Sequence, residues 1–151
     1  MISQQQIERG KSNTTTLSRA ESLHNPPCVL LVEDDRSLRR YFEVVLRQEG
    51  YEVFVASDGL EAMRIALRSP LDIVVTDAIM PNLNGYELCR FLRSTPHLSQ
   101  LRIVLLSALE KNESQREDQN ADVYLSKPIS PEDLIDCIEQ LLQLPQVEQT
   151  T

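Results

Sequence analysis

The sequence predicts an α/β fold: an open, doubly wound sheet of five parallel strands with helices on both faces. Five short apolar runs alternate with segments whose apolar residues recur every three or four positions, which is the pattern of a βα repeat. The third run is apolar and β-branched almost throughout, as in a strand buried on both faces of a parallel sheet. The 151 residues are too few for a (β/α)₈ barrel.

The first strand is predicted over residues 28–32, where an apolar run stops at three consecutive acids. A helix over residues 36–48 follows, because the apolar side chains change to a helical period and mark one face. Gly50 ends this helix in the manner of a C-terminal cap. A second strand is then predicted over residues 51–56.

A second helix over residues 60–67 closes before Pro70, and the β-branched third strand over residues 72–77 comes next. After a loop that contains Pro81, a third helix is predicted over residues 85–94. These elements continue the alternation of strand and helix, so each strand is expected to lie parallel to its neighbours.

The fourth and fifth strands are predicted over residues 101–106 and 122–125. The last helix begins at a cap formed by Ser130 and Pro131 and runs through Leu142. The sequence between these two strands lacks the apolar stripe expected of a packed helix.

The composition is that of an ordinary globular domain. Charged residues make up 25% of the 151, and a chain of this length can bury a core without disulfides. The formal net charge of −8 argues against direct binding of nucleic acid, which needs a basic surface. The three cysteines lack metal-ligand spacing, so we expect buried thiols in a reducing compartment.

No apolar run reaches membrane-spanning length, so we expect no membrane insertion and a cytoplasmic location. We expect residues 1–27 to form a flexible polar tail, residues 28–144 the folded domain, and residues 145–151 a short C-terminal tail. A short helix that docks on a partner is the alternative for the first tail. Because few residues follow the last helix, we expect no effector domain after it.

Polar side chains follow four of the five predicted strands. They are Glu33, Asp34 and Asp35 after the first, Asp77 after the third, Ser107 after the fourth and Lys127 after the fifth. Parallel strands end at one edge, so we expect these side chains to meet beside the crevice where the strand order reverses. An isolated aspartate such as Asp77 more often caps a loop, but its companions at this edge favour a site.

Clustered carboxylates need a counter-charge, and an all-oxygen ligand set suits Mg²⁺. With that charge in place, Asp77 is a plausible nucleophile toward phosphorus. Lys127 would supply a point charge to one phosphoryl oxygen, and Ser107 a hydroxyl donor to another. The residues alone therefore predict a phosphoryl-accepting site that depends on magnesium.

The segments around this site resemble the receiver domain of two-component response regulators. The matching segments are residues 29–35, 75–85, 103–108 and 124–128, within a resemblance that covers roughly residues 27–144. It implies the flavodoxin-like strand order 2-1-3-4-5 and a stand-alone signalling protein like the chemotaxis receivers. The implied partners are a histidine kinase or histidine phosphotransfer protein and a downstream protein target. The chain is then not an enzyme, beyond accepting phosphate from a donor and losing it by itself.

The resemblance also implies roles for single residues. Asp77 matches the phosphorylated aspartate, and Mg²⁺ would be held by Asp34, Asp77, the backbone carbonyl of Ile79 and, through water, Glu33. Asp35 lies one place beyond the acidic pair, so we expect a supporting role for it.

The remaining matches concern the conformational switch. Ser107 matches the switch hydroxyl, Lys127 the family's lysine and Tyr124 the aromatic that changes rotamer. Ala108 is small and leaves the phosphoryl group open to a donor, and the bond between Lys127 and Pro128 is expected to be cis. The alternative for Tyr124 is a half-buried aromatic of the fifth strand.

Two features depart from the family pattern. The stretch from Leu109 to Asn120 has no apolar stripe after Leu109, so we expect a short or mobile fourth helix there. Ile79 and Leu109 flank the phosphorylation site in family terms, and both are apolar. In the family, polar groups at these two positions can orient the water that attacks the phosphoryl group. Two apolar side chains should hinder that water, so we expect slow self-dephosphorylation.

Three alternatives to a signalling receiver stay open. The chain could carry phosphate as a relay intermediate or sink, or it could be a pseudo-receiver that only binds partners. A metal-dependent phosphatase also uses an aspartyl-phosphate, but that chemistry typically places a second acid where this chain has Ile79.

Overall fold

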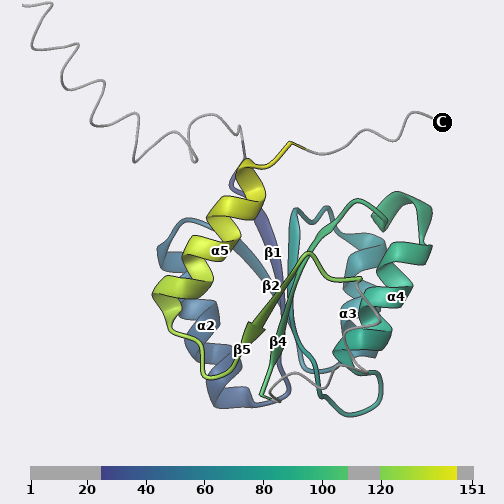
Figure 1. Ribbon diagram of the computed structural model, residues 1–151, viewed down its shortest axis with the longest axis horizontal. Coiled ribbons are helices and arrows are strands. Elements are labelled where there is room, and N and C mark those ends of the chain that lie inside the picture. The colour runs from purple at the N-terminus through teal and green to yellow at the C-terminus, as the bar shows by residue number, and fades with distance from the viewer. Residues whose placement is uncertain (1–24, 109–119, 146–151) are drawn as a thin grey trace, which may run out of the picture.

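The protein forms a five-stranded parallel sheet with the strand order β2-β1-β3-β4-β5, as Figure 1 shows. The computed structural model describes residues 25–108 and 120–145. The strands are β1 (Cys28–Val32), β2 (Glu52–Ala56), β3 (Ile73–Asp77), β4 (Arg102–Ser107) and β5 (Val123–Ser126). The order reverses between β1 and β3, so the predicted fold class and strand order are confirmed.

The helices cover both faces of the sheet (Figure 1). They are α2 (Arg36–Gln48), α3 (Gly59–Arg68), α4 (Gly85–Ser94) and α5 (Pro131–Gln143), with a short 3₁₀ helix η1 (Pro96–Leu98) after α4. Side chains of α2 and α5 share one hydrophobic core with the sheet, and those of α3 and α4 share the other. The predicted layers are therefore correct.

The alternation of side chains along β1 builds both cores. Val29 and Leu31 pack with α2 and α5, whereas Leu30 and Val32 pack with α3 and α4. All five residues of β3 are buried, as expected for a central strand. The register pairs Val32 with Thr76, so β1 and β3 end side by side. This pairing sets where the acids that follow the two strands lie.

Each of the four α-helices begins at a polar side chain that accepts a backbone N–H. Asp35 caps α2, Asp58 caps α3, Asn84 caps α4 and Ser130 caps α5. Such a cap typically contributes about 1 kcal/mol to helix stability. Asp35 therefore has a structural role: its side chain caps the start of α2, and the helix follows the acidic loop directly.

Three local expectations need correction or lie outside the described residues. Tyr51 belongs to the turn after α2, because its N–H donates to the Leu46 carbonyl, and β2 begins one residue later. Only Cys89 of the three free cysteines is buried; Cys28 and Cys137 are partly exposed, because Cys28 begins β1 and Cys137 lines an open hollow between α5 and β5. The short or mobile fourth helix was predicted over residues 109–120, of which residues 109–119 lie outside the described part.

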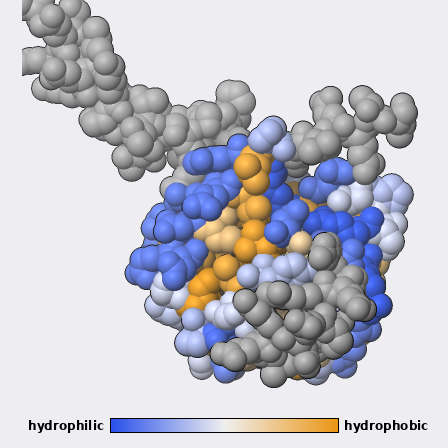
Figure 2. All heavy atoms as spheres, viewed as in Figure 1, coloured by the Kyte–Doolittle hydropathy of each residue, from blue (hydrophilic) through white to orange (hydrophobic). Residues whose placement is uncertain are grey.

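On the face seen in Figure 2, hydrophobic residues gather along α5 and beside the edge strand β5. Residues of both elements line an open hollow of about 870 Å³. No residue of β5 is fully buried, as expected for an edge strand. Within residues 25–108 and 120–145, no helix has the length and apolar character needed to cross a membrane.

Candidate functional site

Three carboxylates meet where β1 and β3 end. Glu33, Asp34 and Asp77 each offer an oxygen, and these oxygens all lie within 4.8 Å of one another. Glu33 and Asp77 are only 3% and 8% exposed, whereas Asp34 is exposed to solvent. The site is therefore buried at Glu33 and Asp77 and open to solvent at Asp34.

Lys127 reaches this cluster from the end of β5, 94 residues away from Glu33 in sequence. Its Nζ lies 2.9 Å from Asp77 Oδ1 and 3.0 Å from Glu33 Oε1. The Lys127 N–H donates to the Ser107 carbonyl, which places the residue against the end of β4. The peptide bond from Lys127 to Pro128 is cis, as the resemblance implied.

The cluster contains more acidic groups than basic ones. Burial raises the pKa of Glu33 to about 7, although the hydrogen bond from Lys127 acts in the opposite direction, and the charge of Asp77 adds to the rise. Burial alone would lower the pKa of Lys127, but its hydrogen bonds to Asp77 and Glu33 outweigh that effect and raise it. One ammonium thus faces three carboxylates, and further positive charge would be favourable.

This donor set fits a hard divalent cation. Carboxylate oxygens and water are the ligands that Mg²⁺ prefers, and the exposed side of Asp34 leaves room for retained waters. Ile79, whose backbone carbonyl was predicted as a further ligand, follows Asp77 by two residues, and its side chain is 55% exposed at the surface.

Close backbone packing holds the loop that follows Asp77. The Ala78 N–H donates to the Leu106 carbonyl, and the Gly85 N–H donates to the Ala78 carbonyl. A Cβ atom on Gly85 would lie 2.1 Å from the Asp77 carbonyl oxygen, so any larger residue would displace the loop. Sequence reasoning placed Gly85 at a helix start but missed this contact, because it depends on a tertiary approach.

A second brace ties the same loop to the start of α3. Asn82 has a positive φ of 68°, and its side-chain amide donates to Asp58 Oδ2 at 2.9 Å. The Gly59 N–H donates to the Leu83 carbonyl at 3.1 Å, beside this bond. The Asn-x-Asn-Gly composition of the loop was the available signal, since asparagine tolerates the left-handed conformation.

The other predicted residues occupy the surroundings of the cluster. Ser107 ends β4 and is half-buried opposite Ser126, and Ala108 is exposed beside it. Tyr124 is 41% exposed, and its hydroxyl accepts a hydrogen bond from the Ala121 N–H at 3.3 Å. Leu109 lies outside the described residues.

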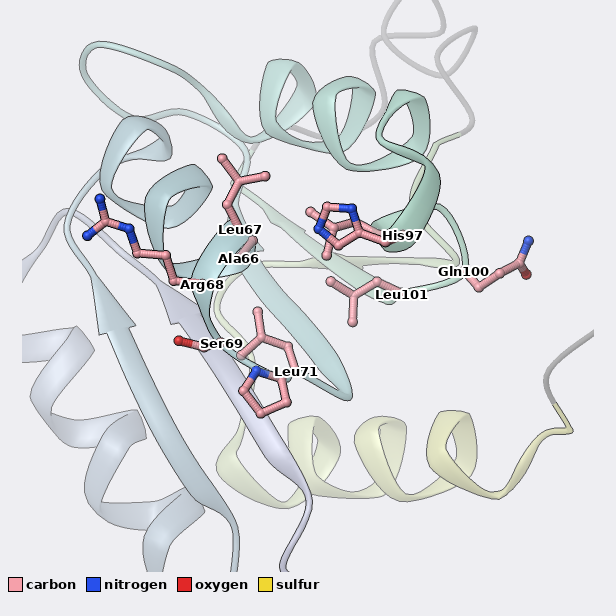
Figure 3. Close-up of a pocket in the computed structure, with 10 residues that line it drawn as sticks. Ala66, Leu67, Arg68, Ser69, Leu71, His97, Gln100 and Leu101 are labelled. Carbon is pink, nitrogen blue, oxygen red and sulfur yellow. The ribbon is translucent and has the colours of Figure 1, made fainter.

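A second hollow lies near the amino-terminal ends of β3 and β4, away from the acidic cluster. Figure 3 shows this space of about 440 Å³ between the end of α3 and the segment around η1. Leu71 and Leu101, which line it, precede β3 and β4, whereas Asp77 and Ser107 end those strands. The hollow is therefore separate from the acidic cluster.

The fold and the cluster define a class: an open α/β protein with an acidic, lysine-paired site at its strand-order reversal. The chain belongs to the response regulator receiver domain family, whose model matches residues 29–139. The family expected from the sequence motifs is thereby confirmed.

Relatives of known sequence agree with this assignment. The chain is 41% identical over 118 residues to "Response regulator MprA" of Mycobacterium leprae, covering 76% of this chain and 50% of that protein. It is 34% identical over 116 residues to "Probable transcriptional regulator ycf29" of Pyropia yezoensis, with 76% and 52% covered. The chain thus spans about half the length of these relatives.

Solved structures are similar as well. The receiver domain of the Francisella response regulator 1452 superposes with a TM-score of 0.71 at 31% identity, covering 78% of this chain and 97% of that one. The receiver domain of sensor histidine kinase PA1611 from Pseudomonas aeruginosa PAO1, solved with magnesium coordinated in its active site cleft, gives 0.73 at 28% identity, with 79% and 99% covered.

Proposed function

We propose that Asp77 accepts a phosphoryl group from a histidine kinase or a histidine phosphotransfer protein. The observation that supports this most is the lysine contact: Lys127 Nζ lies 2.9 Å from a nearly buried Asp77 carboxylate that also faces two further acids. A purely structural aspartate would not need two further carboxylates beside it that share a single lysine. The proposed receiver unit comprises residues 28–144.

In the proposed reaction, a carboxylate oxygen of Asp77 attacks the phosphorus of a phosphohistidine. A P–O bond forms, the P–N bond breaks, and the leaving imidazole takes up a proton. Lys127 would balance charge on one phosphoryl oxygen, and the Ser107 hydroxyl would donate to another. Asp34, Asp77, the Ile79 carbonyl and, through water, Glu33 would hold Mg²⁺, which supplies Lewis-acid neutralisation of the incoming group.

We further propose that signalling follows from movement of Ser107 and Tyr124. An acyl phosphate adds charge and acceptor oxygens that draw the Ser107 hydroxyl inward. The Tyr124 ring, now partly exposed, would then enter the space that Ser107 leaves. Partners would read the change by protein contact, for which the apolar hollow between β5 and α5 offers surface.

The lifetime of the acyl phosphate is the finer part of this proposal. The Ile79 side chain, which is exposed, and the apolar residue type at position 109 would hinder an attacking water, so self-dephosphorylation would be slow. The double change Ile79→Asn with Leu109→Glu should shorten the lifetime, measured as decay of labelled protein. An unchanged lifetime would contradict this part alone.

The experiment that tests acceptance uses the full chain with acetyl phosphate or a phosphorylated histidine phosphotransfer protein. Intact mass should show one added phosphoryl group in the presence of Mg²⁺ and none with EDTA. Asp77→Asn should abolish the addition. Asp72→Asn is the matched control, because it removes the same charge from the opposite edge of the sheet and should leave the addition intact.

The same experiment separates the alternatives. No addition, together with no binding of beryllofluoride, would favour a partner-binding pseudo-receiver. Rapid onward transfer to a second phosphotransfer protein would favour a relay carrier or sink. Turnover of an exogenous phosphomonoester would favour a phosphatase.

A further inference from the structure

Arg39 contacts the backbone of the acidic loop from the first turn of α2. Its Nη1 donates to the Glu33 carbonyl oxygen at 2.8 Å, and the same atom lies 3.5 Å from the Asp34 carbonyl oxygen. The guanidinium is partly buried, and Arg39 itself follows the Asp35 cap of α2 by four residues.

The Arg39 contact completes a set of bonds that hold the acidic loop. The Glu33 N–H donates to the Ala56 carbonyl of β2, and the Arg39 N–H donates to the Asp35 carbonyl. The Asp35 side chain accepts from the Leu38 N–H. The Glu33 and Asp34 carbonyls lie between these anchors, and the Arg39 guanidinium is the group on α2 that binds them.

The identity of the acceptor matters more than the charge of the donor. A guanidinium next to an acidic cluster would ordinarily form a paired contact with a carboxylate. Here it binds main-chain carbonyls instead and does not occupy the carboxylates of Glu33 and Asp34, each of which keeps one oxygen within 4.8 Å of an Asp77 oxygen. Arg39 therefore restrains the loop without occupying the oxygens that could bind a cation.

We propose that Arg39 is a positioning residue for the cation site, holding the Glu33–Asp34 peptide so that both carboxylates face Asp77. This inference rests on the proposed function, since it concerns the same site. Partners that orient metal ligands typically change metal affinity by about 10- to 100-fold when they are removed. Arg39 would act in this way through the backbone rather than through a ligand side chain.

The charge of Arg39 and its contact with the loop predict opposite changes in Mg²⁺ affinity when the residue is removed. A guanidinium near the site repels a divalent cation, so if charge alone mattered, removing Arg39 would tighten Mg²⁺ binding. If Arg39 orients the acidic loop, removing it should weaken Mg²⁺ binding instead. The direction of the change in affinity decides between them.

The experiment measures Mg²⁺ affinity of the full chain by calorimetric titration. Arg39→Ala should bind Mg²⁺ about tenfold more weakly than the unaltered protein. Arg39→Lys keeps the charge and a donor, so it should recover part of the loss. Arg40→Ala is the matched control: it removes the same charge from the neighbouring position, where the side chain pairs with Glu43, and should bind at least as tightly as the unaltered protein.

Circular dichroism and the melting temperature of the metal-free proteins show whether each variant is folded. A merely structural role would lower the melting temperature but leave the Mg²⁺ affinity of folded protein unchanged. That result, or tighter binding by Arg39→Ala, would overturn the inference. If Arg39→Ala does not fold, Arg39→Lys decides alone: weaker binding supports the inference, and equal binding refutes it. Absence of Mg²⁺ binding by the unaltered protein would instead overturn the proposed site itself.

Discussion

Aspartates have different roles at the two ends of the strands, which we call the amino edge and the carboxyl edge of the sheet. At the amino edge, Asp72 precedes β3 and accepts the Cys28 N–H at 2.7 Å, while Asp122 precedes β5 and accepts the Ile103 N–H at 2.7 Å. At the carboxyl edge, Asp34 and Asp77 face each other and Glu33 instead. The same residue type thus closes the sheet at one edge and stays available for a cation at the other.

Two arginines show the same contrast. Arg93 at the amino edge donates to the carbonyls of Ser99, Leu101 and Asn120, and it also pairs with the Asp122 carboxylate. Arg39 at the carboxyl edge donates to carbonyls of the acidic loop. An arginine that pairs with a carboxylate stabilises the fold there, whereas one that donates to main-chain carbonyls leaves the neighbouring carboxylates available to a cation.

The largest expected effect concerns the carboxyl edge. Asp34→Asn should weaken Mg²⁺ binding by at least about 100-fold, because the change removes a proposed direct ligand rather than a residue that positions one. Unfolding of the metal-free protein in urea should show a gain of up to about 1 kcal/mol, since one of three like charges disappears. Loss of stability with retained affinity would show that Asp34 belongs with the structural aspartates.

At the amino edge, replacing an aspartate should lower stability and leave Mg²⁺ affinity unchanged. Asp122→Ala should lower the free energy of unfolding by about 1–3 kcal/mol, because the buried Ile103 N–H loses its acceptor. Calorimetric titration should show unchanged Mg²⁺ affinity. Asp136→Ala, which removes the same charge from the exposed side of α5, serves as the control and should be nearly neutral.

The hydrogen bond from Asn82, in the loop that follows Asp77, to Asp58 at the start of α3 should show a smaller effect. Asn82→Ala should cost about 2 kcal/mol in urea unfolding, from left-handed strain together with the lost bond to Asp58. Asn82→Gly loses the bond but adopts the same backbone freely, so it should cost about 1 kcal/mol or less. Equal losses in the two variants would mean that the positive φ adds nothing.

The smallest effect should appear at acid pH. The Glu61 N–H, and after it the Asn82 amide, lower the pKa of Asp58 below its ordinary value of 3.8. The unfolded chain therefore binds this proton more readily, so the stabilisation is present above pH 3.8 and is lost as the pH falls below it. Asp58→Asn, which can still cap α3, should lose less stability between pH 6 and pH 3 than the unaltered protein.

Much of the fold and of the site could be predicted from local patterns. The β-branched run of β3 indicated a buried central strand, and the acids after β1 and β3 indicated a charged edge. Tyr51 was misplaced, because its apolar ring looks the same in a strand as in the turn that it closes. Arg39 escaped notice, since a basic side chain on a polar helical face gives no sign of which carbonyl it will reach.

The sequence by itself determined the elements, their caps and the polar residues at the strand ends, because these depend on neighbours a few positions away. Only the tertiary structure decided which of those residues meet: Lys127 reaches Glu33 across 94 positions, and Asn82 reaches Asp58 across 24. Such contacts depend on strand order, register and loop path, which are set by the packing of the two cores. The chemistry was therefore encoded locally, and its geometry was decided by long-range packing.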